Sequence, residues 1–430
     1  MSEKIVPLTI DRLSYGPAGV GRSDGKVVFV PGTVPGDEVD VVIDEEKKNY
    51  ARGHVAALTV PSPYRRTPPC PYVTQCGGCP WQHITYAEQL RAKEATVREQ
   101  LQRIGGIADP PVLPILAAPS EWHYRHRIRV RVENNTRLGF SPPQSHAVVE
   151  IESCLIAGET SDLQLKAARA WVTRLRTPLH HVEIIEHGQA KGEVSCVLIG
   201  EADGLFQHAD DATGTQFLRT HPVVSGLMLS GQGWRRTWGD PSATYDLGVD
   251  SLSLTVNRGT FTQVNPRGNQ TLIATLLQLG HFCKEQRVIE LYCGAGNLSL
   301  PIAHRVASLI GIESAFDAVA DARTNATRVG VTNAQFVHAA AHAGVQQLLQ
   351  KNTSCDVIVL DPPRTGAAEV ITVLPRFAAR TICYVSCDPT TLARDIRQLQ
   401  QRGYRLHVAQ PIDLFPQTYH VETIAVCVLT

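Results

Sequence analysis

The sequence predicts a multidomain α/β protein with a small N-terminal β-barrel, a central α+β region and a C-terminal Rossmann-like domain. First, the chain has 430 residues, more than one ordinary hydrophobic core accommodates. Second, residues 1–60 contain short β-rich runs separated by Gly and Pro. Third, strand-like apolar runs alternate with helical segments from residue 256 onward, which is typical of a doubly wound parallel sheet.

The composition, cysteine content and net charge indicate what kind of protein the chain forms. The chain is 43% hydrophobic and 19% charged, as in soluble globular proteins. The N-terminus lacks the pattern of a signal peptide and no apolar run is long enough to span a bilayer, so we expect a cytoplasmic location. Eleven cysteines in such a chain indicate reduced thiols, a metal site or catalysis rather than disulfides. A formal net charge of zero argues against a general polyanion binder but allows a local basic surface.

The N-terminal region and the segment that follows it contain local patterns that predict strands, a linker and a helix. The β-rich runs KVVFV (26–30) and EVDVVI (38–43) flank the turn-forming PGTVPGD. The proline-rich PSPYRRTPPCPY that follows indicates a linker. A helix is predicted over 86–104, because apolar residues recur at helical spacing, Thr85 and Glu88 match a capping box, and Gly105 suits the stop.

The C-terminal region begins with a nucleotide-type loop, VIELYCGAGNLSLPIA. Gly294 and Gly296 follow a strand directly and precede a helix expected near Leu298, so the backbone there can turn sharply and approach a ligand. Glu313 ends the next strand, where a carboxylate can accept hydrogen bonds from ribose hydroxyls. Because Leu298 replaces the third glycine of a dinucleotide motif, the pattern favours S-adenosylmethionine over NAD.

Two further strand ends carry reactive groups. Asp361 ends a strand in VIVLDPPRTG, with Arg364 where methyltransferases of exocyclic amines usually carry an aromatic residue. Cys387 ends the next strand in YVSCDPTTLARD, and Glu422 precedes the last strand in FPQTYHVETIAV. Carbon 5 of a pyrimidine takes a methyl group only after a thiolate has added to C6, and a base must then remove the C5 proton. Cys387 and Glu422 are therefore the candidate nucleophile and base, and we interpret His420 as structural.

Four cysteines form a second unusual pattern. Cys70, Cys76 and Cys79 lie in CPYVTQCGGCPWQ, and Cys154 follows in IESCLI. Four thiolates suit zinc or an iron–sulfur cluster, and a single CxxC pair favours the cluster. A redox disulfide within CGGC is an alternative, but it leaves Cys70 unexplained.

A basic strand is predicted in HYRHRIRVR. Its four arginines at a period of two lie on one face of a strand, within a stretch (61–131) that has ten Lys/Arg against five Asp/Glu. We predict RNA contact there, although a charge row is often only a solvated face. Nearby aromatic residues are candidates for base stacking or for core packing. The arginines are Arg125, Arg127, Arg129 and Arg131, and the aromatic residues are Trp81, Trp122 and Tyr124.

Taken in order, LYCGAGN, LDPPRTG, YVSCDPTTLARD and FPQTYHVE resemble the RNA (uracil-5-)-methyltransferases, and the resemblance covers essentially the whole chain. It implies a class I methyltransferase domain over 256–430, with Cys387 as nucleophile and Glu422 as base. It also implies S-adenosylmethionine contacts from Gln263, Tyr292, Asn297, Glu313 and Asp361. One departure is Ala340, at a helix start that often carries a polar residue near the adenine, so backbone or water is expected to make that contact.

The remaining regions resemble parts of the same family. IDRLSYGPAGVGR, GKVVFVPGTVPGDEV and KKNYARG resemble a TRAM domain, an OB-like RNA-binding barrel, over 1–60. The resemblance implies a [4Fe-4S] cluster on Cys70, Cys76, Cys79 and Cys154 in a central domain over 61–255, whose helix 86–104 is a candidate to pack on the catalytic domain.

The implied reaction is C5 methylation of a uridine in 23S ribosomal RNA through a covalent adduct. The T-loop uridine of tRNA is an alternative substrate, and a non-catalytic RNA-binding protein an alternative class, weakened by the presence of both Cys387 and Glu422. A cytosine-C5 methyltransferase usually carries Pro-Cys, whereas proline here follows in Cys-Asp-Pro. We expect no membrane or DNA partner.

Overall fold

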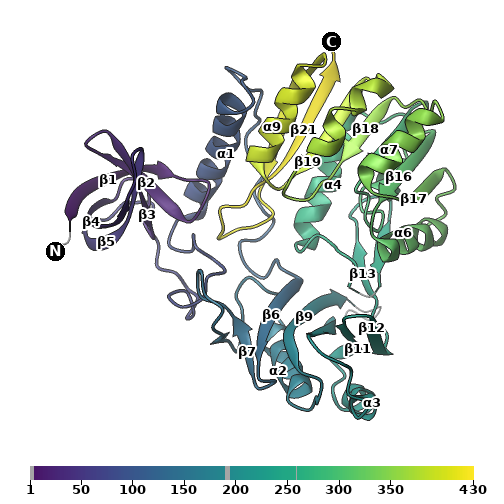
Figure 1. The fold of residues 1–430 in the computed structure, drawn as a ribbon, viewed down its shortest axis with the longest axis horizontal. Coiled ribbons are helices and arrows are strands. Elements are labelled where there is room, and N and C mark those ends of the chain that lie inside the picture. The colour runs from purple at the N-terminus through teal and green to yellow at the C-terminus, as the bar shows by residue number, and fades with distance from the viewer. Residues whose placement is uncertain (1–3, 189–193, 258) are drawn as a thin grey trace.

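The computed structural model describes residues 4–188, 194–257 and 259–430, and Figure 1 shows their three parts. The first part is a closed barrel in the order β1-β2-β3-β5-β4, which confirms the predicted N-terminal barrel. Aliphatic side chains such as Ile10, Val30 and Val41 fill its interior. The strands are β1 (Ile5–Leu13), β2 (Ala18–Ser23), β3 (Lys26–Pro31), β4 (Glu38–Glu46) and β5 (Tyr50–Val60).

The predicted helix is α1 (Tyr86–Arg103), but its capping box does not form. Thr85 is the N-cap without a side-chain hydrogen bond, and the carboxylate of Glu88 pairs with Arg91 instead of returning to the cap. The helix does not belong to the core of the central region. Val97 and Leu101 are buried in the core of the C-terminal domain, so α1 packs there although it lies far away in the sequence.

The central part is one sheet in the order β12-β11-β10-β9-β6-β7-β8. Helices α2 and α3 share its core, where Trp171 and Phe217 are fully buried. A two-stranded hairpin, β13–β14, follows this sheet in the chain. The elements are β6 (Arg127–Glu133), β7 (Arg137–Phe140), β8 (Val149–Glu150), α2 (Ser161–Val172), β9 (Leu179–Gly188), β10 (Val194–Ala202), α3 (Asp210–Thr220), β11 (Val224–Gly231), β12 (Trp234–Gly239), β13 (Ala243–Asp246) and β14 (Ser253–Val256).

The C-terminal part is a doubly wound sheet in the order β17-β16-β15-β18-β19-β21-β20. Strands β15 to β19 run parallel, and β21 is antiparallel to both neighbours. Helices α4, α5 and α6 cover one face, whereas α1, α7 and α9 cover the other. The elements are α4 (Pro266–Gly280), β15 (Arg287–Leu291), α5 (Ser299–Ala303), β16 (Ser308–Glu313), α6 (Phe316–Arg328), β17 (Ala334–His338), α7 (Ala341–Gln350), β18 (Val357–Leu360), α8 (Ala368–Ile371), a 3₁₀ turn (Leu374–Phe377), β19 (Thr381–Ser386), α9 (Pro389–Gln400), β20 (Tyr404–Ile412) and β21 (Glu422–Leu429).

The domain boundary predicted after residue 255 falls inside β14, the second strand of the β13–β14 hairpin. Apolar side chains of both strands, Ala243 and Leu254 among them, are buried in the core under α4. We therefore propose that the catalytic unit begins near β13. Across the described ranges, every helix falls short of the length and hydropathy that crossing a membrane requires.

Candidate active site

The predicted nucleophile and base lie beside each other at one edge of the C-terminal sheet. Ser386, the last residue of β19, pairs with Thr423 of the antiparallel strand β21. The next positions along this pairing are Cys387 and Glu422. The parallel neighbour β18 ends one residue before Asp361, which brings a second carboxyl group to the same edge.

Cys387 lies in a short connection, residues 386–389, that we name the thiol loop. Its side chain is partly buried between the end of β19 and the start of α9. Asp388 caps α9 by accepting hydrogen bonds from the N–H groups of Thr390 (2.9 Å) and Thr391 (3.0 Å). Burial, and then the negative charge of Glu422, raise the pKa of the Cys387 thiol to about 11, while the guanidinium of Arg364 acts in the opposite direction.

The carboxyl group of Glu422 is buried, and that of Asp361 beside it is partly buried. Glu422 is 2% exposed, and its Oε1 has no hydrogen-bond partner among the described residues. Burial, followed by the charge of Asp361, raises the pKa of Glu422 well above its usual value. Burial also raises the pKa of Asp361 to about 7. A cationic ligand bound beside these two groups would stabilise their ionised forms.

The residues proposed to bind the cofactor lie along the same edge of the C-terminal sheet. Glu313 ends β16, and its carboxylate accepts hydrogen bonds from the N–H groups of Gly294 (3.1 Å) and Ala315 (2.8 Å). Gly294 has a φ of 54°, and a Cβ placed there would meet nothing within 4 Å. The loop after β15 therefore turns around the Glu313 carboxylate and leaves open space beside its backbone.

The other predicted cofactor residues surround that loop. Tyr292 follows β15 with a φ of 63°, a conformation that is uncommon for a residue with a side chain. Asn297 exchanges amide hydrogen bonds of 2.8 and 2.9 Å with Asn269 of α4. Gln263 lies partly exposed in the segment that leads into α4. Ala340 is the N-cap of α7 and makes no side-chain hydrogen bond there, as its methyl group requires.

Arg364 is a site residue that the sequence reasoning did not assign. Its NH2 lies 3.3 Å from Nε2 of His420, and its charge acts on both Cys387 and Glu422. Burial, and then Arg364, lower the pKa of His420 to about 4, so this imidazole is neutral at physiological pH. The sequence feature that could have identified Arg364 is its position, as a cationic residue directly after Asp-Pro-Pro.

The four predicted cysteine ligands come together in the central part of the molecule. Cys70, Cys76 and Cys79 from the linker line one small cavity with Cys154 from the segment after β8. Aromatic and aliphatic side chains, including Tyr72, Phe140 and Ile156, complete its wall. All four thiols are free, so the structure does not support the alternative of a disulfide within CGGC.

The basic strand is less available for RNA than its sequence indicated. Arg127 makes a bidentate ion pair with Glu183 of β9, at 2.6 and 2.7 Å, and Arg129 pairs with Glu201 of β10. Carboxylates that the one-dimensional pattern could not show therefore balance much of the row. Two of the three candidate stacking residues, Trp81 and Tyr124, are buried, whereas Trp122 stays partly exposed beneath the guanidinium of Arg66.

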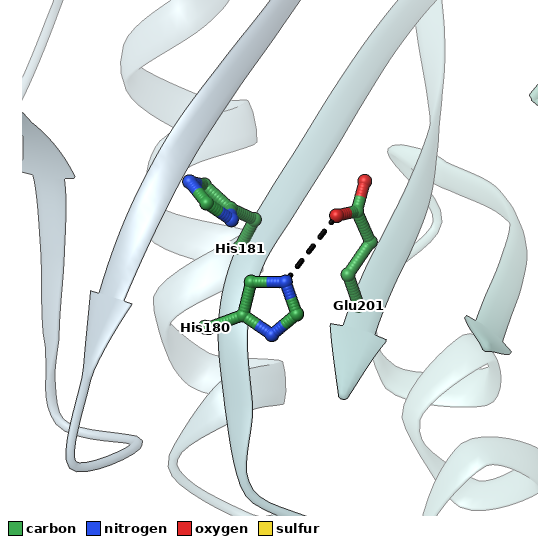
Figure 2. A group of neighbouring side chains, drawn as sticks. All are labelled: His180, His181 and Glu201. Carbon is green, nitrogen blue, oxygen red and sulfur yellow. Dashed lines mark ion pairs between the residues drawn. The ribbon is translucent and has the colours of Figure 1, made fainter. Parts of the chain in front are cut away.

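Figure 2 shows His180, His181 and Glu201, and Arg129 of the basic row pairs with Glu201. A β-bulge leaves His180 unpaired between Leu179 and His181, and Nε2 of His180 lies 3.5 Å from Oε2 of Glu201. The ligand atoms of the three residues all lie within 4.8 Å of one another. Because Arg129 already neutralises Glu201, a metal ion would have to compete with a guanidinium, and we interpret the group as an ion-pair cluster.

The fold and the site define a class I methyltransferase preceded by an RNA-binding type of barrel. A family profile described as tRNA (Uracil-5-)-methyltransferase matches residues 244–428, and a TRAM domain profile matches residues 2–56. An uncharacterized RNA methyltransferase of Bacillus cereus is 33% identical to this chain, covering 98% of it and 96% of the relative. The 23S rRNA (uracil(1939)-C(5))-methyltransferase RlmD of Aeromonas hydrophila is also 33% identical, over 98% of this chain and 95% of its own.

A crystal structure shows the same fold over nearly the whole chain. It is the tRNA (uracil-54, C5)-methyltransferase of Pyrococcus abyssi in complex with S-adenosyl-L-homocysteine, with a TM-score of 0.72 and 23% identity over 98% of this chain and 100% of that one. The chain belongs to the S-adenosylmethionine-dependent RNA (uracil-5-)-methyltransferase family and carries an N-terminal TRAM domain. These findings confirm the resemblance found in the sequence.

Proposed function

We propose that the protein methylates C5 of a specific uridine in 23S ribosomal RNA, with S-adenosylmethionine as methyl donor and Cys387 as covalent nucleophile. The observation that carries the proposal is the pairing of β19 with β21 up to Ser386 and Thr423, which brings the next residues, Cys387 and Glu422, to the same edge of the sheet. The relatives named as 23S rRNA methyltransferases support the choice of RNA.

The proposed reaction uses both side chains in sequence. The thiolate of Cys387 adds to C6 of the flipped-out uridine, forming an S–C6 bond and moving an electron pair toward C5 and the C4 carbonyl. C5 then takes the methyl group, and the sulfonium becomes the neutral thioether of S-adenosylhomocysteine. The carboxylate of Glu422 removes the C5 proton, the C5=C6 double bond forms again, and the thiolate leaves.

The protonation states of the free site require a change on ligand binding. A thiol with a pKa of about 11 is protonated at neutral pH, and so is Glu422 when its pKa is strongly raised. We propose that Arg364 and the positive charge of the sulfonium stabilise the thiolate and the carboxylates together. The nucleophile and the base would then become active only in the loaded complex.

We further propose that Gln263, Tyr292, Asn297, Glu313 and Asp361 contact S-adenosylmethionine. Their position at the carboxyl edge of the parallel sheet, where such folds bind ligands, supports this role. Glu313 would accept hydrogen bonds from the ribose. Backbone or water would bind the adenine amino group in place of a side chain at Ala340.

The four-cysteine cavity fits the proposed [4Fe-4S] cluster better than zinc. Tetrahedral zinc with Zn–S bonds near 2.3 Å holds its sulfurs only about 3.8 Å apart. Among the described residues, only His180, His181 and Glu201 form a group of three possible ligand atoms that all lie within 4.8 Å of one another. No three of the four cysteine sulfurs therefore lie that close together, and their spacing is wider than zinc requires. The cluster would tie the linker to the central sheet and take no part in methyl transfer.

Separate assays with RNA transcripts test the reaction and its substrate. The purified protein is incubated with methyl-labelled donor and either 23S rRNA or tRNA, and 5-methyluridine is measured by nucleoside mass spectrometry. We expect the modified base in 23S rRNA. Its appearance in tRNA alone would keep the mechanism and overturn the substrate.

Two substitutions test the chemistry. Cys387→Ala should abolish methylation while donor binding persists, and Glu422→Gln should accumulate a covalent RNA adduct that survives a denaturing gel. Cys283→Ala is the matched control, because Cys283 is exposed and outside the site. Methylation by Cys387→Ala at the wild-type rate would contradict the mechanism.

A further inference from the structure

Tyr15 of the barrel reaches the thiol loop of the catalytic domain. It lies between β1 and β2, and its hydroxyl lies 3.2 Å from Oδ2 of Asp388, to which it donates. The same hydroxyl is 3.5 Å from the backbone carbonyl oxygen of Cys387. The contact therefore joins the RNA-binding type of domain to the backbone of the proposed nucleophile, across 372 positions in the sequence.

Tyr15 fills a hydrogen-bonding position that the rest of the thiol loop leaves open. Oδ1 of Asp388 is occupied by the cap of α9, and Tyr15 supplies the partner of Oδ2. On the other side, the hydroxyl of Ser386 donates to the backbone oxygen of Asp388 (3.0 Å) and accepts from its N–H (3.2 Å). The main chain around Cys387 is thus held by β19, by α9 and by the barrel.

The ring of Tyr15 also meets the segment that leads to Glu422. It packs edge-on against Tyr419, with ring centroids 5.8 Å apart. Trp81 fixes this arrangement, because its ring lies 6.4 Å from that of Tyr419 and its Nε1 donates to the carbonyl of Gly16 (3.2 Å). The barrel loop is therefore in contact with both strand ends that carry the proposed nucleophile and base.

We infer that Tyr15 is a positioning residue for Cys387, through which the TRAM barrel acts on the chemical step as well as on RNA binding. Attack on C6 needs the sulfur within a narrow range of positions, so loss of one restraint on its backbone should slow the reaction. Burial, and then Asp388, raise the pKa of Tyr15 above its usual value, so the phenol remains a hydrogen-bond donor. The kinetic part of this inference rests on the proposed function.

Tyr15→Phe tests the inference because it removes the hydroxyl and keeps the ring against Tyr419. At saturating RNA and donor, we expect single-turnover methyl transfer to slow about five- to tenfold, the range expected for one hydrogen bond. The dissociation constant for RNA should stay within about twofold, since the hydroxyl is bonded to Asp388 and Cys387 of the protein itself. Tyr50→Phe is the matched control: the same change on the same barrel, at a tyrosine that packs against Phe29.

Alkylation of Cys387 gives a readout that needs no RNA substrate. The rate of its reaction with iodoacetamide is followed by peptide mass spectrometry, and thermal unfolding verifies that each variant is folded. We expect Tyr15→Phe, but not Tyr50→Phe, to change this rate about threefold or more, as for loss of one hydrogen bond near the thiol.

The outcomes separate the two proposals. A changed alkylation rate in a protein that methylates neither RNA would retain the positioning role and overturn the proposed function. Unchanged alkylation and methyl transfer would overturn the positioning role. Weaker RNA binding with an unchanged rate at saturation would also overturn it and make Tyr15 an RNA contact.

Discussion

At the scale of single residues, the active site holds two carboxyl groups, Asp361 and Glu422, whose ionised forms a bound cation would stabilise. Asp361 and Glu422 make no ion pair within the described ranges, and each is desolvated by its surroundings. S-adenosylmethionine carries a sulfonium, whereas S-adenosylhomocysteine is neutral at that sulfur. Carboxyl groups that ionise beside the sulfonium would favour the substrate over the product, which promotes product release.

The carboxyl pair predicts a difference in pH dependence between donor and product. Because the pKa of Asp361 is about 7 in the free protein, lowering the pH from 8 to 6 converts its carboxylate into the acid. We expect the affinity for S-adenosylmethionine to fall several-fold over this range, at most about tenfold per pH unit for one proton. Titration calorimetry at several pH values measures it. The affinity for S-adenosylhomocysteine should change much less, and equal slopes would argue against this account.

The site residues that the sequence predicted are recognisable from local motifs, whereas the roles of those it missed depend on contacts between distant segments. Cys387 directly follows β19 and Glu422 is the first residue of β21, each in a distinctive motif, so their location at a sheet edge followed from the strand pattern. Tyr15 and Arg364 matter because of where the barrel and the loop after β18 lie in three dimensions. No local pattern in either segment encodes that docking.

At the scale of elements, α1 is fastened to the catalytic domain by a buried ion pair. Lys93 and Asp413 are 0% exposed and 2.6 Å apart, and Lys93 also donates to the carbonyl oxygen of Phe415 (3.0 Å). Asp413 and Phe415 begin the segment that ends at Glu422. The helix therefore supports the strand end that carries the proposed base.

Replacing Lys93 should destabilise the protein strongly. Lys93→Met leaves the Asp413 carboxylate buried without its partner, which costs about 3–5 kcal/mol. Chemical denaturation measures the free energy of unfolding. On the same helix, Arg103→Ala removes an exposed pair with Glu99 and should cost less than about 1 kcal/mol. The double variant Lys93→Met/Asp413→Leu should recover part of the loss, and a single variant with wild-type stability would refute the account.

Elements were predictable where their signal is local. The period of α1 and the alternation after residue 256 depend on neighbours in the sequence, and both predictions agree with the structure. The order of the central sheet is different, because β6 pairs with β9 about fifty residues later and with β7 on its other side. Such pairing depends on long-range packing, which short strands without a regular helix alternation do not specify.

At the scale of the whole molecule, the linker contacts all three parts. Arg65 pairs with Asp37 of the barrel, Arg66 donates to Gln417 near the active site, and Tyr72 packs on the central core. The proposed cluster lies in this linker, so it would fix the barrel and the central sheet relative to the thiol loop. Because Tyr15 contacts Asp388, the proposed cluster and the proposed positioning contact would be mechanically connected.

This connection predicts the effect of removing one cysteine. The anaerobically purified protein should contain about four iron and four sulfide ions per chain, with visible absorbance, and Cys154→Ser should lose both. The variant should also unfold at a lower temperature, since Cys154 would be the ligand that ties the linker to the central sheet. Cys283→Ser, which changes an exposed thiol elsewhere, should keep the metal and the stability. One zinc ion per chain in place of iron would overturn the cluster, and full stability of Cys154→Ser would show that protein contacts alone hold the linker.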